Sequence, residues 1–288
     1  MTRLAVEERV LTVLRWLVIA FLLVITVFPF YYMLVLSFVP IEQLLLHPSR
    51  IYVTAGEFTL GTYHQVLASV QDGGQGFAGF LRNSAEVAIA TVVISLVVSI
   101  PGAYAIARLR FFGRRQVSAL FLAVYMFPAI VLAIPLFVAF AKLGLVESLV
   151  GLTIVYVVLT VPVSIHMLRQ YFETIPESIE EAAALDGAGR IATMLRITLP
   201  LAIPSIMSTS LYVFMIAWNE FLFALLFLSA KPNLWTVSLG LAQLSNGIEV
   251  PKTVLMAGSV ILTVPIVLLY GVAERALTEG LTTGADKG

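Results

Sequence analysis

Carboxylates gather in one short, comparatively polar segment of a chain that is otherwise mostly apolar. Glu177, Glu180 and Glu181 lie close together, and two small alanines, Ala182 and Ala183, follow them. Carboxylates pair with cationic side chains, and alanine permits close approach, so this pattern suits a basic-lined groove on a partner. The alternative is a linker lying on lipid headgroups, but helices of that kind favour lysine and arginine on their polar face.

Two short helices are predicted in this segment. Thr174 and Glu177 have the spacing of a capping box, with Pro176 in the first turn, so a helix is expected to begin there. Gly187 can adopt the left-handed conformation that ends it. A second helix is expected to follow and to stop at Pro200. Its apolar face would consist of Ile191, Met194, Leu195 and Thr198.

A second group of polar side chains lies inside an apolar run. Trp218, Asn219 and Glu220 fall in the outer part of a predicted membrane span. An ionisable group is costly to bury there without a partner, so Glu220 is a functional candidate. A structural hydrogen-bond network near the outer interface, with Trp218 as an interfacial anchor, explains the same residues equally well.

The sequence contains no constellation for catalysis or for metal binding. Cysteine is absent, and neither H-E-x-x-H nor G-x-S-x-G occurs. His166 is a lone imidazole, for which a structural role is expected. G-x-x-x-x-G-K-[ST] is absent as well, so nothing is expected to cradle a nucleotide phosphate. We therefore expect no enzymatic activity and no bound nucleotide, cofactor or metal.

The composition is that of an integral membrane protein. Of the 288 residues 60% are hydrophobic and 12% are charged, and the mean hydropathy is +0.99, which is unusual for a water-soluble domain of this length. The formal net charge is zero, so the totals indicate no nucleic-acid partner. The lipid membrane is the partner that the composition predicts.

Six segments are long and apolar enough to cross a bilayer, which takes roughly 20 residues. They are found at about 15–38, 82–107, 116–140, 150–170, 201–229 and 253–273. The first is too long for the apolar core of a signal peptide and lacks a small-residue cleavage site, so we interpret it as a retained span. The expected organisation is an N-terminal segment at 1–14 and one transmembrane domain at 15–288. A loop at 171–200 and a tail at 274–288 belong to that domain.

The distribution of lysine and arginine predicts the orientation. With six spans both termini lie on one side, and that side carries twelve of the 17 basic residues against five on the other. The tight turn at 108–115 alone contains four arginines. The positive-inside rule therefore places the termini and the loop at 171–200 in the cytoplasm.

The segment 181–200 resembles the EAA coupling motif of the permease subunits of ATP-binding-cassette (ABC) importers. Glu-Ala-Ala at 181–183 is followed after three residues by Gly187, and after nine more by Ile-Thr-Leu-Pro at 197–200. Other stretches resemble the smaller, MalG-type permease of maltose-type sugar importers. They are found at 82–84, 102–108, 110–114, 134–136, 143–145, 217–221 and 279–288. Phe112 and Asp286 depart from the family's pattern.

This resemblance implies an all-α integral membrane protein with the six-span type I ABC importer permease fold, in the bacterial cytoplasmic (inner) membrane. The implied function is transport of a mono-, di- or oligosaccharide, driven by separate ATPase subunits that bind ATP and Mg. The implied partners are a second homologous permease in a heterodimer, two ATPase subunits and an extracellular or periplasmic solute-binding protein.

The resemblance also assigns roles to particular residues. Those implied to couple to the ATPase are Glu181, Ala182, Ala183, Asp186, Gly187, Ile197, Leu199 and Pro200. In the tail, Thr282, Thr283 and Gly284 are implied to contact the ATPase dimer; the alternative is a disordered terminus. Trp218, Asn219 and Glu220 are implied to line the central cavity, where they would belong to the substrate path or to an outer gate.

Two other transport functions stay open at this point. An ABC importer permease for glycerol-phosphate esters is the first, although the mid-membrane parts of the spans carry no lysine or arginine for a phosphate. A proton-coupled secondary transporter is the second. Such a transporter usually needs several intramembrane carboxylates or histidines, and only Glu220, Glu86 and His166 are available.

Overall fold

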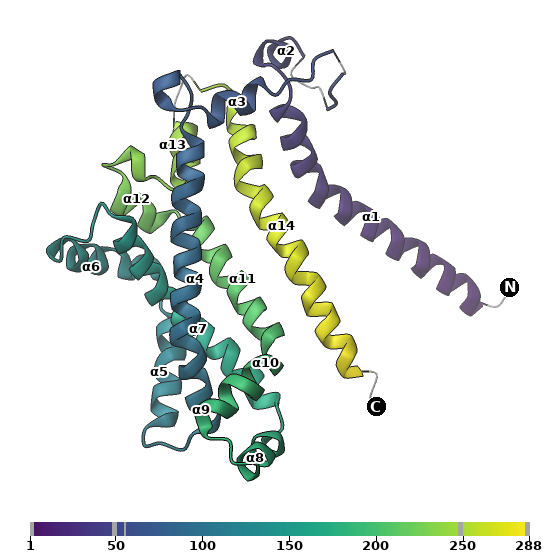
Figure 1. Cartoon of the computed structure of the whole chain (residues 1–288). Helices are drawn as coiled ribbons and strands as arrows, with labels where there is room; N and C mark the ends of the chain where they lie inside the picture. Colours follow the sequence, from purple (N-terminus) through teal and green to yellow (C-terminus); the bar gives the residue numbers. More distant parts are fainter. Residues whose placement is uncertain (1–2, 48–50, 55, 247–249, 286–288) are drawn as a thin grey trace. The chain divides into compact units, whose positions relative to one another are not determined.

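The computed structural model describes residues 3–47, 51–54, 56–246 and 250–285. Within these ranges the chain is all-helical and contains no strand, as predicted (Figure 1). It divides into two compact units, residues 1–77 with 243–263 and residues 78–242 with 264–288. Each unit is described by itself below.

The first unit contains α1 (Arg3–Ser37), α2 (Ile41–Leu46), α3 (Gly61–Leu67) and a 3-10 turn (Val70–Asp72). Aromatic side chains organise the segment that follows α1. The ring of Phe38 lies 4.9 Å from that of Phe58 and 5.1 Å from that of Tyr63, measured between centroids. The Ser37 hydroxyl is 2.7 Å from the Tyr63 hydroxyl. These contacts fasten α3 to the end of α1.

The second unit contains most of the remaining helices. They are α4 (Phe77–Arg108), α5 (Arg114–Met126), α6 (Ala129–Lys142), α7 (Leu149–Thr174), α8 (Glu177–Leu185), α9 (Arg190–Thr193), a π turn (Met194–Thr198), α10 (Leu199–Leu201), α11 (Ile203–Asn219), α12 (Leu222–Leu228) and a 3-10 turn (Pro232–Leu234). Two further helices, α13 (Val237–Asn246) and α14 (Lys252–Ala285), each have residues in both units.

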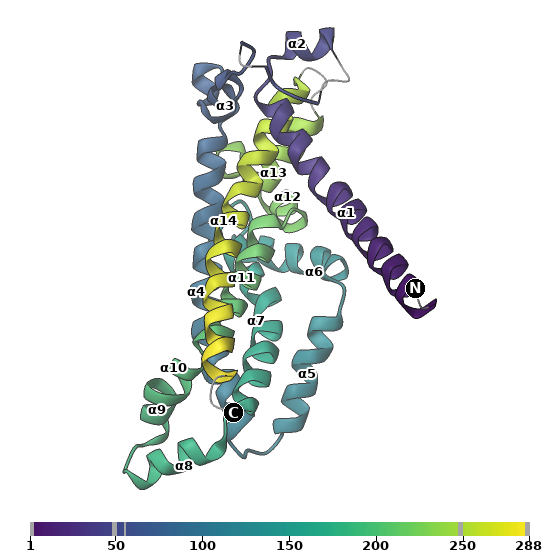
Figure 2. The ribbon, with the colours of Figure 1, turned by 90° about the vertical axis from the view of Figure 1, so that its right-hand side faces the viewer.

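Helix α7 is central to the second unit, because both α5 and α11 pack along it (Figure 2). It begins where the Ser148 side chain accepts a hydrogen bond of 3.0 Å from the amide of Gly151, which satisfies one of the free donors at the helix start. It carries no charged side chain before Arg169, and twelve of its residues are buried, as expected of a helix that packs on several sides.

Four helical segments are long and apolar enough to span a membrane: Glu8–Ser37, Phe77–Arg108, Leu149–Thr174 and Lys252–Glu274. The count rises to six if each of two bent helix pairs forms one span. Four of the six predicted spans therefore correspond to single helices, and the other two are broken.

The predicted span at 116–140 consists of two helices, α5 and α6, which are bent by 97° relative to each other. Phe127 has extended backbone angles (φ −77°, ψ 128°) and Pro128 immediately precedes α6. Proline disfavours helical angles in the residue before it and cannot donate to the helix, so the chain turns at this point instead of kinking.

The predicted span at 201–229 is broken as well. It ends as α11 at Asn219, and α12 starts afresh at Leu222, because Glu220 has extended angles (φ −63°, ψ 129°). At the other end, the prediction that the preceding helix stops at Pro200 is wrong. Helix α10 continues to Leu201, and the segment Arg190–Leu201 then meets α11 at an angle of 77°.

The last helix is longer than predicted. The span expected at 253–273 lies within α14, whose backbone stays helical as far as Ala285. The tail residues Thr282, Thr283 and Gly284 therefore belong to this helix, in place of a separate polar tail. Asp286 lies outside the described residues.

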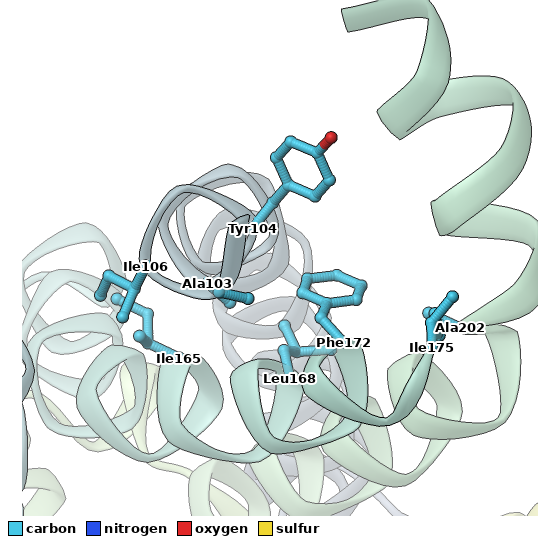
Figure 3. Close-up of a cluster of buried hydrophobic side chains, with 9 residues drawn as sticks. Ala103, Tyr104, Ile106, Ile165, Leu168, Phe172, Ile175 and Ala202 are labelled. Carbon is cyan, nitrogen blue, oxygen red and sulfur yellow. The ribbon is translucent and has the colours of Figure 1, made fainter. Parts of the chain in front are cut away.

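One apolar cluster packs both ends of the segment that contains α8 to α10 against α4 and α7. Ala103, Tyr104 and Ile106 of α4 face Ile165, Leu168 and Phe172 of α7, and Ile175 and Ala202 lie beside them (Figure 3). The rings of Tyr104 and Phe172 meet edge to face with centroids 6.2 Å apart. This packing joins the end of α4, the end of α7 and both ends of the chain segment that contains α8 to α10.

Candidate functional site

Helices α8 to α10 project from one end of the second unit as a compact hairpin (Figures 1 and 2). The bend between α8 and α9 is made by Gly187, whose φ of +85° lies in the left-handed region. The amide of Gly187 donates to the carbonyl of Ala184, and the amide of Ala188 donates to that of Ala183. These two bonds form a Schellman motif, which caps the end of α8, and they confirm the predicted glycine bend.

The start of α8 differs from the prediction, because no capping box forms. Pro176 occupies the cap position without a side-chain bond, and the Thr174 hydroxyl donates to the carbonyl of Tyr171 at 2.7 Å. Helix α7 extends to Thr174 itself, which places this hydroxyl over the last turn of α7, away from the amides of α8. Ile175 and Pro176 alone connect the two helices.

Glu180 is the hub of the site. One of its carboxylate oxygens lies 3.0 Å from Nε of Arg108, at the end of α4, and accepts a bond of 2.9 Å from the hydroxyl of Thr198. The other accepts a bond of 3.1 Å from the hydroxyl of Tyr104. One carboxylate thus joins the hairpin helix α8 to the end of α4 and to the π turn that leads into α10.

The ion pair between Arg108 and Glu180 is largely shielded from water. The side chain of Arg108 is 7% exposed and that of Glu180 is 14% exposed. A second nitrogen of Arg108 donates to the carbonyl of Ile175, and its guanidinium also lies 3.9 Å from the exposed carboxylate of Glu177. Because both charged groups are buried and hydrogen-bonded, removal of either one would leave an uncompensated charge.

Sequence reasoning did not identify this hub. Arg108 contributes to the predicted orientation and to the family-like stretch at 102–108, and Glu180 is one of three carboxylates in the sequence pattern, but neither pattern pairs the two residues. The available signal was an arginine at the very end of an apolar run, one turn after Tyr104, together with an acidic helix that could fold back to it.

The outer surface of the hairpin carries exposed apolar and acidic side chains. Leu185 is 91% exposed and Ile191 is 72% exposed. Glu181, Ala182 and Asp186 are exposed beside them. Large exposed apolar groups next to acidic ones are typical of a protein-binding surface.

The other residues predicted to contact a partner have different positions. Ala183 is only 6% exposed and packs inside the chain. Ile197 and Leu199 are half-buried, and Pro200 is exposed at the end of the hairpin. The structure therefore brings the predicted residues into one hairpin but divides them between its surface and its interior.

The carboxylate of Glu220 is engaged by neighbouring groups of the chain. It accepts a bond of 2.7 Å from the hydroxyl of Tyr156 on α7. The amides of Phe223 and Ala224 donate to it at 3.0 to 3.2 Å, and the hydroxyl of Ser238 donates to its main-chain carbonyl. Glu220 thus caps the start of α12, where a negative charge is favourable. This geometry matches the predicted structural network better than a binding position.

The two residues before Glu220 have different surroundings. Trp218 is buried, and its ring stacks on that of Phe214 with a centroid distance of 5.3 Å. Asn219 is exposed, and its side-chain amide donates to the carbonyl of Met215 at 2.9 Å. Of the three residues proposed for the substrate path, Asn219 is the one whose side chain is accessible.

The polar residues Asn83 and Ser84 fasten α4 to the chain before α13. The amide group of Asn83 donates to the carbonyls of Asn233 and Trp235, each at 3.0 Å. The Ser84 hydroxyl accepts a bond of 2.8 Å from the amide of Val237. These bonds hold the segment that follows α12 against the start of α4.

Comparison with known proteins shows one consistent family. The sequence profile of the binding-protein-dependent transport system inner membrane component matches residues 99–282, a range that includes the hairpin and Glu220. The inner membrane ABC transporter permease protein YcjP of Escherichia coli is 39% identical over 271 residues, which cover 94% of each chain.

Two further relatives agree with this match. The trehalose/maltose transport system permease protein MalG of Thermococcus litoralis is 38% identical over 285 residues, which cover 98% of each chain. A chain in the crystal structure of a bacterial ABC transporter involved in alginate import is 23% identical, with a TM-score of 0.79 over 96% of this chain and 98% of that one. The chain therefore belongs to the family of binding-protein-dependent transport system inner membrane components and is a multi-pass membrane protein with the fold of an ABC importer permease.

Proposed function

We propose that this chain is one permease of a sugar importer, and that ATP hydrolysis on separate subunits drives it through the hairpin α8–α10. The observation that carries this proposal is the position of Glu180. A hairpin with an exposed apolar and acidic surface is bonded through one shielded carboxylate to the end of a membrane-spanning helix. A movement imposed on the hairpin surface would thereby be passed to α4.

The roles within the hairpin follow from exposure. Glu181 and Asp186 offer charges to a basic groove, while Ala182 permits close approach and Leu185 offers a large apolar contact. Gly187 keeps the bend between α8 and α9. Ala183, Ile197, Leu199 and Pro200 would act by holding the hairpin's shape.

The proposed partners are a second homologous permease, two ATPase subunits that carry ATP and Mg, and an extracellular or periplasmic solute-binding protein. Family membership supports this set, because an inner membrane component of a binding-protein-dependent system works with such subunits. In the tail, Thr282, Thr283 and Gly284 are proposed to reach the ATPase subunits from the end of α14. The termini and the hairpin would then lie in the cytoplasm.

A sugar is the proposed substrate class. The relative from Thermococcus litoralis is named for trehalose and maltose, and the structural neighbour belongs to an importer of a polysaccharide. Asn219 is the accessible polar side chain with which this chain would meet sugar hydroxyls. A glycerol-phosphate ester is the alternative, and it would require cationic groups from the second permease. Membership of a binding-protein-dependent family removes the reason to consider proton-coupled transport.

The coupling role is tested by reversing the exposed charge of Glu181. In the assembled complex, Glu181→Lys is expected to abolish sugar-stimulated ATP hydrolysis while membrane insertion is retained, because an exposed side chain contributes little to folding. Gly187→Pro should have the same effect, since proline cannot adopt a positive φ.

Glu8→Lys is the matched control, because it makes the same charge reversal on an exposed residue outside the hairpin. It should leave the stimulated hydrolysis unchanged. Normal stimulation in both hairpin variants would refute the coupling role. Uptake driven by a proton gradient without ATP would overturn the importer assignment as well.

A further inference from the structure

A cavity of about 480 Å³ opens among arginines at the ends of α4, α5 and α7. Its polar wall consists of Arg114, Arg115 and Arg169 with the hydroxyl of Ser118, and its apolar wall includes Ile106 and Leu122. It lies on the face of α5 that packs towards α7 and does not include the hairpin residues. None of the roles proposed above uses it.

The cavity carries excess positive charge. Glu173 is the one carboxylate that pairs with these arginines among the described residues, and it lies 2.8 Å from Arg169 and 4.0 Å from Arg114. Three guanidinium groups therefore face a single carboxylate, which leaves two positive charges to be balanced.

The arginines differ in how far the chain already uses them. Arg169 also donates to the Ser118 hydroxyl, and Arg114 donates to the carbonyl of Ala107 at 3.1 Å. These bonds fix the two guanidinium groups at the cavity wall. Arg115 has no hydrogen-bond or ion-pair partner among the described residues, although its side chain lines the cavity. Its five N–H donors are available to an anion.

The chemistry of this wall matches a phosphate group. Guanidinium forks bind phosphate oxygens in pairs, and fixed arginines lose little freedom when they do so. The cavity also adjoins the first turn of α5, where the helix dipole favours an anion.

The surroundings indicate a lipid as the source of that phosphate. The arginines lie next to the ends of α4 and α7, which are both apolar enough to span the membrane. The cavity face of α5 continues from Leu122, in the cavity wall, to Met126 one turn further on. Both apolar side chains are exposed, so an acyl chain could lie along them. Basic pockets between membrane helices on the cytoplasmic side are known sites for anionic headgroups. We propose that this cavity binds the phosphate of an anionic phospholipid, with an acyl chain of that lipid along α5.

Binding can be measured on the assembled complex in nanodiscs of phosphatidylcholine, into which phosphatidylglycerol is titrated. Phosphatidylglycerol is expected to raise the melting temperature, and Arg115→Gln should weaken this effect by about tenfold in lipid concentration, as expected for the loss of a charge-assisted hydrogen bond. Arg115 is exposed and bonds to no other group among the described residues, so the variant should fold. Arg110→Gln is the matched control, because Arg110 lies in the same turn but does not line the cavity.

Three results would overturn the proposal. If nanodiscs of phosphatidylcholine alone stabilise the complex as much as nanodiscs that contain phosphatidylglycerol, recognition of an anionic headgroup would be excluded. Equal stabilisation by inorganic phosphate alone would identify a free anion as the ligand in place of a lipid. An effect of Arg115→Gln no larger than that of Arg110→Gln would show that the charge acts generally along the turn and that the cavity is not the site.

Discussion

At the scale of single residues, Glu180 has the most consequential environment in the hairpin. Its two oxygens accept from three side chains that come from α4 and from the π turn. This carboxylate connects α8 to Arg108 of α4, which lies 72 residues earlier in the chain, and to Thr198 of the π turn, which lies 18 residues later. Its neighbour Glu181 is exposed and has no hydrogen-bond or ion-pair partner in the part of the chain that the structure describes, so two adjacent glutamates have different environments.

Neutralising Glu180 should therefore uncouple the hairpin from α4. Glu180→Gln keeps the shape but removes the charge that balances Arg108, which for a shielded pair costs about 3 kcal/mol or more. We expect a lower melting temperature together with loss of sugar-stimulated ATP hydrolysis. Differential scanning fluorimetry and an ATPase assay on the assembled complex measure the two effects.

Glu181→Gln is the matched control for this prediction, because it makes the same change on the next residue of the same helix. It should change the free energy of unfolding by no more than about 0.5 kcal/mol, as for other exposed positions, and so leave the melting temperature nearly unchanged. If Glu180→Gln and Glu181→Gln lower the melting temperature equally, the contacts of Glu180 do not stabilise the fold.

At the scale of elements, the break between α11 and α12 depends on Glu220. Helix α11 ends at Asn219. The carboxylate of Glu220 accepts hydrogen bonds from the first amides of α12 and from the Tyr156 hydroxyl. The same residue was a candidate for the substrate path on sequence grounds, because an ionisable group within a span is a functional candidate by default. Its bonds within the chain give it a different explanation.

This distinction predicts different outcomes for two neighbouring residues. Glu220→Gln should lower stability by about 1 to 3 kcal/mol, since it weakens a helix cap and a buried bond to a charged group, while the half-saturating sugar concentration for transport stays near the wild-type value. Asn219→Ala should do the opposite, because its side chain is exposed and supports no other element. Thermal unfolding and initial uptake rates separate the two. A large rise in the half-saturating concentration for Glu220→Gln at unchanged stability would restore Glu220 to the substrate path.

Sequence patterns predicted some of these elements and missed others for identifiable reasons. Apolar length was sufficient for α4 and α7, and the positive φ of Gly187 follows from its place at a helix end. The turn at Phe127 and Pro128 lies inside the single span predicted at 116–140, because composition alone does not show whether neighbouring helices satisfy the freed backbone groups. Thr174 and Glu177 had the right spacing for a capping box, but α7 extended to include Thr174. The Glu180 hub depends on contacts 72 and 76 residues apart, which no local pattern contains.

At the scale of the whole molecule, the family and the fold are clear, and the orientation in the membrane is still a prediction. It depends on twelve basic residues against five, and on the proposed contact between the hairpin and a cytoplasmic ATPase subunit. The connection from the hairpin to the chain after α12 passes through α11, which is the apolar segment between them. A position on the hairpin and a position after α12 should therefore be accessible from opposite sides of the membrane.

The absence of cysteine makes this orientation directly measurable, because any introduced cysteine is the only thiol in the chain. Leu185→Cys and Ala230→Cys both replace exposed side chains and should preserve the fold. In membranes that contain the permeases without the ATPase subunits, which would cover Leu185, a membrane-impermeant maleimide is expected to label Leu185→Cys in inverted vesicles alone and Ala230→Cys in right-side-out vesicles alone. Ala224→Cys, at a fully buried position of α12, is the control and should be labelled in neither preparation.

The reversed pattern would place the hairpin outside the cell, where no ATP-binding subunit could reach it, and the proposed coupling would fail together with the orientation. Labelling of both exposed cysteines in the same preparation would mean that α11 and α12 do not cross the membrane, so that the bent helices form a re-entrant loop.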